Sequence, residues 1–187
     1  MKTRAIVACI TVFLLASSAW GQRPPDLSGV WKIDVDHSDY GDLQGPSSRT
    51  DIIEQHDTEI TETVSAIYKH QPQSYVLHFT TDGRKTVFPS GKEIHIPPAR
   101  LFGIAATWKD NTLVVSEWIH VDDFDIPARY LYDLSPDGTR LTMTLFLGQA
   151  KPSATFVFIR SSSKDDEPGN SPDNAHVPRC LTEGHAA

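Results

Sequence analysis

Apolar and polar residues alternate with a period of two along most of the chain between residues 27 and 160. In the segment Ser74–Thr81, Tyr75, Leu77 and Phe79 share one face, and His78 lies on the other. Successive side chains of a β-strand point to opposite faces of a sheet, so this period is typical of half-buried strands. Almost no stretch shows the spacing of an amphipathic helix. The pattern predicts an all-β domain.

The alternation and the turn signals between its segments predict an antiparallel sheet of about eight to ten strands. The expected segments are Gly29–Val35, Arg49–Gln55, Glu59–Tyr68, Ser74–Thr81, Thr86–Phe88, Lys92–Ile96, Leu101–Lys109, Thr112–Val121, Ala128–Leu134, Arg140–Leu147 and Ala154–Arg160. Closing such a sheet into an up-and-down barrel removes the exposed edge strands. An open sheet or a sandwich would show the same alternation and is the alternative.

Three local expectations accompany this strand pattern. Asp82-Gly83 predicts a hairpin turn, because glycine adopts the positive φ of a tight primed turn. The two short segments Thr86–Phe88 and Lys92–Ile96 are expected to pair with each other. The long polar loop that follows Val35, with Gly41, Gly45 and Pro46, is the expected place for a single helical turn.

Residues 1–21 have the composition of a secretion signal. Lys2 and Arg4 precede the apolar run Ala5–Ala16, and small residues follow before the expected cut after Gly21 or Ala19. The run is shorter than the roughly 20 apolar residues of a membrane-spanning helix. We therefore expect an exported, periplasmic or extracellular protein with no membrane span after cleavage; a retained anchor is the alternative.

The remaining chain divides into three parts. Residues 22–26 contain two consecutive prolines and form a stiff, extended lead-in. Residues 27–160 form the β-barrel domain. Residues 161–187 are rich in Ser, Asp, Pro, Asn and Gly, with few bulky apolar residues, and are predicted to be a disordered tail.

The net charge of the chain narrows the classes of binding partner. The chain has 17 basic and 24 acidic residues, a net charge of -7, and cleavage would remove Lys2 and Arg4 and leave about -9. Such a charge argues against binding of nucleic acid or of an anionic membrane surface.

Cys180 is the one cysteine expected in the mature chain, so no internal disulfide is expected. It lies in the polar tail, and we assign it no catalytic or metal-binding role.

The start of the domain resembles a known family. Gly29-Val30-Trp31, placed on the first strand after a proline-rich lead-in, resembles the opening of lipocalins and lipocalin-like barrels. The run Leu27–Asp34, with Ser38 and the later Ser47–Thr50, is similar to secreted bacterial lipocalin-like proteins of unassigned function. The resemblance covers about residues 27–160. The chain lacks the second lipocalin motif and the disulfides common in secreted lipocalins.

The resemblance implies an architecture and a class of function. In lipocalins the tryptophan packs at the closed end of the barrel against a late arginine, which implies a structural plug formed here by Gly29, Trp31 and Arg160. It also implies binding of a small hydrophobic or amphipathic ligand inside the barrel. Aromatic residues at alternating strand positions supply cavity candidates: Tyr75, Phe79, Trp108, Trp118, Tyr130 and Tyr132. The alternative is that these rings simply fill the core.

Motifs for catalysis and metal binding are weak. The stretch from His120 to Asp125 has three carboxylates that could bind a cation. Because the spacing of an EF-hand is missing, we favour the interpretation that it is a solvated acidic loop. The histidines lack zinc-site spacing, and no nucleophile elbow or phosphate loop occurs. We assign no catalytic residue, metal or cofactor. Two further functions stay open: a cell-envelope interaction module, and an enzyme that uses the barrel mouth.

Overall fold

The computed structural model describes residues 23–96 and 99–161. The expectations for the secretion signal, for Cys180 and for nearly all of the tail fall outside the described residues. Within the described part, no helix is long and apolar enough to cross a membrane.

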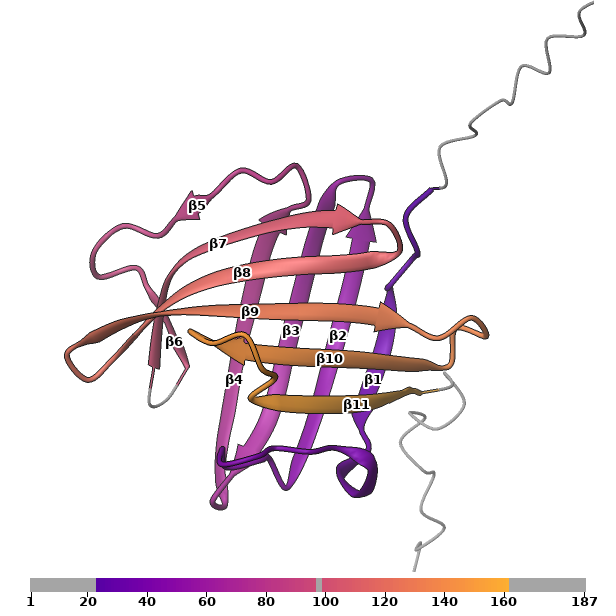
Figure 1. Ribbon diagram of the computed structural model, residues 1–187, viewed down its shortest axis with the longest axis horizontal. Coiled ribbons are helices and arrows are strands. Elements are labelled where there is room, and N and C mark those ends of the chain that lie inside the picture. Colours follow the sequence, from indigo (N-terminus) through magenta and orange to yellow (C-terminus); the bar gives the residue numbers. More distant parts are fainter. Residues whose placement is uncertain (1–22, 97–98, 162–187) are drawn as a thin grey trace, which may run out of the picture.

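The described chain forms antiparallel strands and one short 3₁₀ turn (Figure 1). In chain order these are β1 (Gly29–Ile33), η1 (Val35–His37), β2 (Ser48–His56), β3 (Glu59–Tyr68), β4 (Gln71–Thr80), β5 (Thr86–Val87), β6 (Ile94–Ile96), β7 (Ala99–Lys109), β8 (Thr112–Val121), β9 (Phe124–Leu134), β10 (Arg140–Leu147) and β11 (Ala154–Arg160). One sheet of 11 strands contains them in the order β4-β3-β2-β1-β11-β10-β9-β8-β7-β5, and β6 also pairs with β7.

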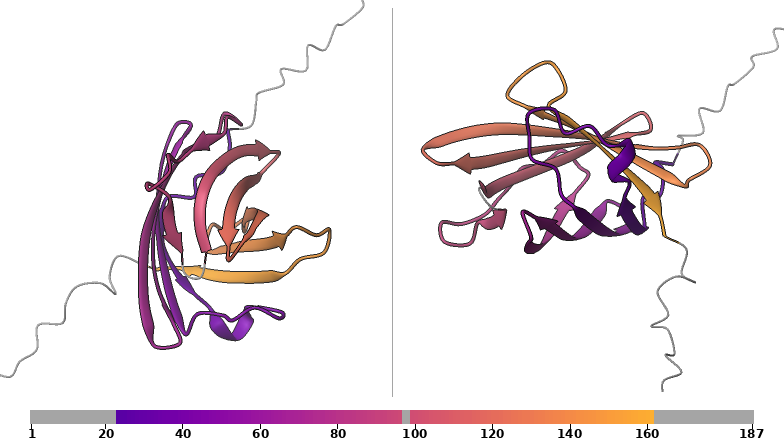
Figure 2. Two further views of the ribbon diagram at one scale, coloured as in Figure 1. Left: turned by 90° about the vertical axis from the view of Figure 1, so that its left-hand side faces the viewer. Right: turned by 90° about the horizontal axis from the view of Figure 1, so that it is seen from below.

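The sheet curls into a nearly closed barrel. Strands β1–β4 form one wall and strands β7–β11 run across them as the other (Figures 1 and 2). The chain leaving β4 then joins the far side of the sheet: Asp82 bridges Thr107, and the Gly83 amide donates to the Ala106 carbonyl oxygen at 2.9 Å. The predicted all-β antiparallel barrel is confirmed.

Two local expectations are wrong. Asp82-Gly83 does not turn β4 into a hairpin, because the next strand, β5, pairs with β7. The two short segments do not pair with each other, because each pairs with a different stretch of β7. The expected single helical turn forms at Val35–His37, at the start of the polar loop, where the Ser38 hydroxyl donates to the Asp34 carbonyl oxygen at 2.7 Å.

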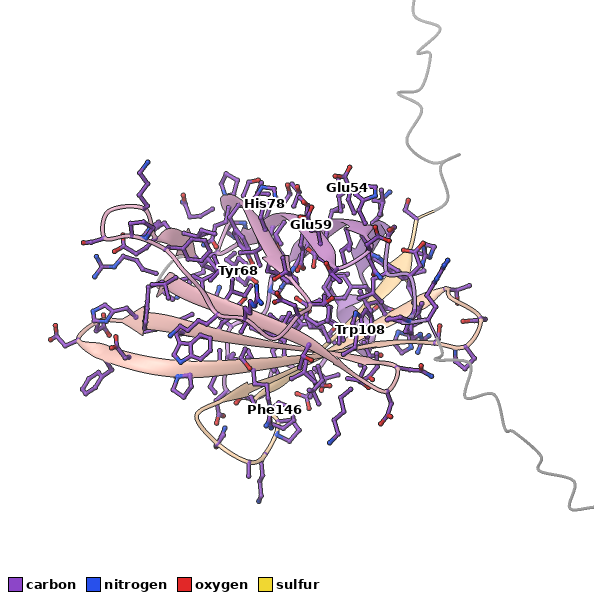
Figure 3. All side chains as sticks on the ribbon, turned by 90° about the horizontal axis from the view of Figure 1, so that it is seen from above. Glu54, Glu59, Tyr68, His78, Trp108 and Phe146 are labelled. Atoms are coloured by element: carbon purple, nitrogen blue, oxygen red, sulfur yellow. The ribbon has the colours of Figure 1, made fainter. Side chains whose placement is uncertain are left out.

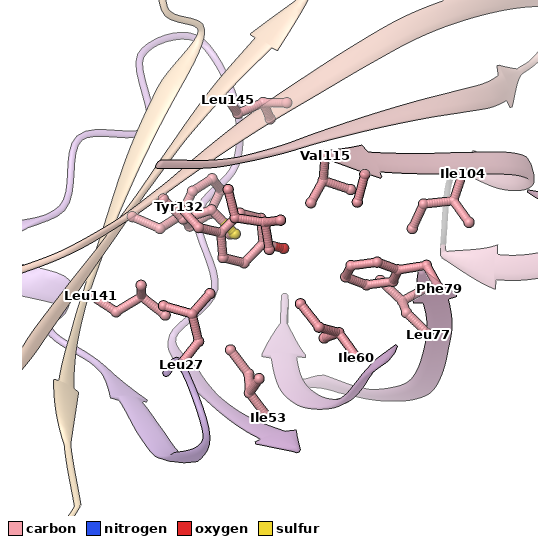
Figure 4. Packing of buried hydrophobic residues seen from close by; sticks show 14 of the residues in the cluster. Leu27, Ile53, Ile60, Leu77, Phe79, Ile104, Val115, Tyr132, Leu141 and Leu145 are labelled. Atoms are coloured by element: carbon pink, nitrogen blue, oxygen red, sulfur yellow. The ribbon is translucent and has the colours of Figure 1, made fainter. Parts of the chain in front are cut away.

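The core lies between the two walls (Figure 4). The core follows from the alternation: inner-facing positions are mostly apolar and buried, and outer-facing positions are mostly polar. Both walls contribute, among others through Leu27, Ile53, Ile60, Phe79, Val115, Leu141 and Phe158.

Trp31 is fully buried at the start of this core. Its exposed fraction is 0%, and its Nε1 donates to the Leu27 carbonyl oxygen at 2.9 Å. The guanidinium of Arg160, on the neighbouring β11, lies 4.2 Å from the centroid of the Trp31 ring. A cation over an indole contributes about 0.5–2 kcal/mol beyond the area that the ring buries.

The same arginine ties three segments of the chain together. Its Nε donates to the Gly138 carbonyl oxygen at 2.7 Å, and its Nη1 donates to the Ser28 carbonyl oxygen. Gly29 makes room for it: φ is +149° there, and a Cβ would lie 2.7 Å from Arg160 Nη1. Glycine is therefore needed for both backbone conformation and space.

We expect Trp31→Ala to lower the free energy of unfolding by about 3–5 kcal/mol, because it removes a fully buried indole and leaves a cavity. Urea denaturation of the variant and the wild type measures this difference. Val87→Ala, at a position 61% exposed, is the control and should change stability little. A Trp31→Ala protein as stable as the control would contradict the plug role.

Candidate functional site

Five of the six aromatic candidates line the inner face of the barrel. Phe79 and Tyr132 belong to the buried core, and Tyr75, Trp108 and Tyr130 pack against it while half-buried. Tyr130 and Tyr132 come from β9 with ring centroids 6.5 Å apart. Figure 3 shows Trp108 between the two walls.

Trp118 lies on the outer face instead. On β8 the buried positions are Leu113, Val115 and Glu117, so the next residue points outward. There the Nζ of Lys85 lies 3.7 Å from the centroid of the Trp118 ring. Trp118 is thus separated from the other candidates by the thickness of the sheet.

Four charged side chains meet inside the barrel, and sequence reasoning missed them. Arg49 and Asp51 come from β2, Glu62 from β3 and Glu117 from β8, with exposed fractions of 7%, 2%, 1% and 5%. We call them the interior polar cluster. A signal for it exists in the sequence, because each carboxylate occupies a position that alternates with apolar residues of its own strand, such as Glu62 between Ile60 and Val64.

Arg49 is fully engaged with its neighbours. Its Nε donates to Asp51 Oδ1 at 2.8 Å, and its Nη2 lies 2.8 Å from Asp51 Oδ2. The rings of Phe156 and Phe158 lie 5.6 and 5.3 Å from the guanidinium carbon. This two-point pairing compensates the buried charge of Asp51 with that of Arg49.

The two glutamates are left with free hydrogen-bonding capacity. Tyr132 donates to Glu62 Oε2 at 3.0 Å and so links the two walls. The other oxygen, Glu62 Oε1, lies 3.7 Å from Arg49 Nη2 and has no hydrogen-bond partner among the described residues. Within the same part of the chain, the Glu117 carboxyl group makes no hydrogen bond.

Burial makes both glutamates weak acids. It raises the pKa of Glu62 to about 8, with a further contribution from the charge of Asp51. Burial also raises the pKa of Glu117 to about 7, although Arg49 acts in the opposite direction. Burial disfavours the charged form of each carboxyl group, and the attraction of Arg49 offsets this only in part.

Other polar atoms near the inner face also lack partners. The buried Gln73 Oε1, Tyr40 Oη and Trp108 Nε1 have no hydrogen bond within the described residues. Unpaired buried polar atoms cost free energy and call for a partner. An otherwise apolar barrel with such atoms inside has the chemistry to hold a small molecule that is apolar over most of its surface and polar at one end.

The barrel also carries a groove on its outer face. It has a volume of about 560 Å³ and lies over β8, β9 and the loop after β10. Trp118, Arg129 and Phe146 line it, and the Arg129 guanidinium carbon lies 4.5 Å from the Phe146 ring centroid. Figure 3 shows Phe146 on the side of its sheet that faces away from β2–β4.

The acidic hairpin end does not gather cation ligands. His120 Nδ1 lies 2.7 Å from Asp125 Oδ1 across the β8–β9 hairpin. No group of three or more His, Cys, Asp or Glu side chains in the described ranges is arranged to hold a metal ion. We therefore assign no cation site to this hairpin.

Comparison with known proteins supports the fold. No protein-family model matches the chain, and no curated protein matches it in sequence. Among solved structures, a secretory abundant heat soluble protein of Ramazzottius varieornatus has a TM-score of 0.52 and 14% identity, over 74% of this chain and 98% of that chain. The fold is a lipocalin-like barrel.

A second structural neighbour is more distant. It is a fatty acid binding protein of Schistosoma mansoni, solved in complex with arachidonic acid, with a TM-score of 0.45 and 11% identity over 73% of this chain and 96% of that one. At these identities the likeness extends to the fold alone.

We expect the free energy of unfolding to fall as pH is raised from about 5 to about 8. In this window the folded state keeps protons on Glu62 and Glu117, whose pKa values are about 8 and about 7, while the unfolded chain, near 4.5, has lost them. Each proton contributes a slope of up to about 1.4 kcal/mol per pH unit. Urea midpoints across this range measure the effect.

The variant E62Q/E117Q removes both titrations and should flatten the dependence. E54Q/E59Q is the matched control, because Glu54 and Glu59 are exposed on the outer side of the same barrel wall (Figure 3). If the slope in E62Q/E117Q equals that of the control, the two buried carboxyl groups do not titrate in this range.

Proposed function

We propose that this chain is an exported lipocalin-like barrel that binds one small amphipathic ligand in its interior. The observation that carries the proposal is the set of buried, unpartnered polar atoms inside an apolar barrel, with Glu62 Oε1 foremost. A ligand with an apolar body would lie against the inner aromatic side chains. Its polar end would supply the hydrogen bonds that the interior polar cluster lacks.

The inner aromatic side chains fit this role. Tyr75, Tyr130 and Trp108 contact the core and are only partly buried. Such rings offer large apolar contact areas and, through their polar atoms, hydrogen bonds. The proposed site therefore joins both walls of the barrel.

The proposal of export rests on the sequence of residues 1–21. A charged start, an apolar run and small residues before Gln22 are the features that a signal peptidase recognises. We therefore propose that the barrel works outside the cytoplasm.

An outer-face interaction module of the cell envelope is the second candidate. The groove over Trp118 and Phe146 favours it, because an apolar hollow on the outside of a barrel is the feature that such a module needs. The two candidates differ in which tryptophan a bound molecule contacts.

We expect purified mature protein, once stripped of lipid, to bind dodecanol in a one-to-one complex seen by native mass spectrometry. Binding inside the barrel should alter the emission of Trp108, so W108F should lose the fluorescence change and W118F should keep it. The reverse result would move the site to the outer groove. A barrel that is always empty and never takes up dodecanol would refute the binding function.

We expect expression of the full chain in a bacterial host to yield a protein that lacks residues 1–21 or 1–19, because the apolar run engages the export machinery. Intact-mass measurement of the purified protein gives the cut. L14R/L15R places charges in that run and should leave the chain uncut. A wild-type protein that keeps its first residues would contradict export by cleavage.

A further inference from the structure

The interior polar cluster has an excess of acidic groups. Its three carboxyl groups face one guanidinium, which gives a formal charge of -2 when every group is ionised. The other polar side chains that face it are the phenols of Tyr68, Tyr75, Tyr130 and Tyr132, which burial holds uncharged by raising each pKa. No second cation is buried among the described residues.

The one cation in the cluster already pairs with a carboxylate. Two donors of Arg49 are committed to the carboxylate of Asp51 at 2.8 Å, and the rings of Phe156 and Phe158 lie close to its guanidinium. A ligand carboxylate placed here would meet Glu62 and Glu117, and it would compete with Asp51 and Glu62 for the same guanidinium. Like charges at close range in a low-dielectric interior repel strongly.

When Glu62 and Glu117 are ionised, the unpartnered atoms of the cluster accept hydrogen bonds. Glu62 Oε1 is buried without a partner, the Glu117 carboxyl group makes no hydrogen bond in the described structure, and both side chains are at least nine-tenths buried. On β4, Gln73 Oε1 is a further buried acceptor without a hydrogen bond among the described residues. These atoms come from three strands on both walls, so they require a donor that sits inside the barrel.

We propose that the interior polar cluster selects an amphipathic amine, whose protonated head group donates to Glu62 and Glu117 while its apolar tail lies along the aromatic inner face. This inference rests on the proposed function, since it names the ligand class of the same site. An ammonium group supplies three donors and a positive charge. It would satisfy both glutamates and bring the formal charge of the cluster from -2 to -1.

The test compares three probes with the same tail: dodecylamine, dodecanol and dodecanoate, each below the concentration at which it forms micelles. Their affinities are measured by isothermal titration calorimetry at pH about 8. We expect dodecylamine to bind about tenfold or more tightly than dodecanol, and dodecanoate to bind most weakly. The E62Q/E117Q variant should bind dodecylamine about tenfold more weakly than the wild type does, while its affinity for dodecanol should change little.

The pH dependence supplies a second readout. Amine binding should strengthen as pH rises from about 6 to about 8, because Glu62 and Glu117, with pKa values of about 8 and about 7, must lose protons to pair with ammonium. Binding should release protons, which calorimetry in buffers of different ionisation enthalpy counts. E54Q/E59Q, with both changes on the outer face, should behave as wild type.

The outcomes separate this inference from the proposed function. Tighter binding of dodecanoate than of dodecylamine, or equal binding of all three probes with no effect of E62Q/E117Q, would overturn the amine preference and leave the ligand-binding barrel standing. Failure of every probe to bind folded protein would overturn the proposed function itself. Circular dichroism of each variant, with E117Q alone as a milder change, shows that lost binding is not lost folding.

Discussion

Ladder hydrogen bonds hold each strand of this barrel in register with its neighbours, and a slip of one residue would turn every inner side chain outward. On β3 such a slip would expose Ile60 and Val64 and bring Thr61 and Thr63 inside. The same register places Glu62 within hydrogen-bonding distance of Tyr132 on the opposite wall. The apolar core and the interior polar cluster are therefore fixed by one constraint.

The interior polar cluster is a poor choice for stability alone. Replacing a buried ion pair with apolar residues of similar volume is often neutral or stabilising, because the desolvation of two charges offsets their attraction. Here the Arg49–Asp51 pair is joined by two glutamates that have no cation of their own. A core built only for stability would have apolar side chains at these positions, as it has at Ile53.

The fold was largely accessible from the sequence, and the site was accessible only in part. Alternation places Phe79 and Tyr132 correctly inside, because each follows the apolar row of its strand. Trp118 was grouped with them as an aromatic residue at an alternating strand position, although the alternation within β8 turns its side chain outward. Nothing in the sequence placed Glu62 or Glu117 beside another charged side chain. Which of them meet depends on the pairing of distant strands, which alternation does not encode.

The pairing of β1 with β11 has a consequence for how the chain reaches this state. The first strand of the domain takes one neighbour from β2 and the other from the last strand, and Arg160 bonds to Ser28 across nearly the whole domain. One edge of β1 thus stays unpaired until β11 has been synthesised. Contacts so distant in sequence slow folding. Joining β1 to β11 is therefore a late step, and until then the first strand of the domain has one open edge at which another extended chain could pair.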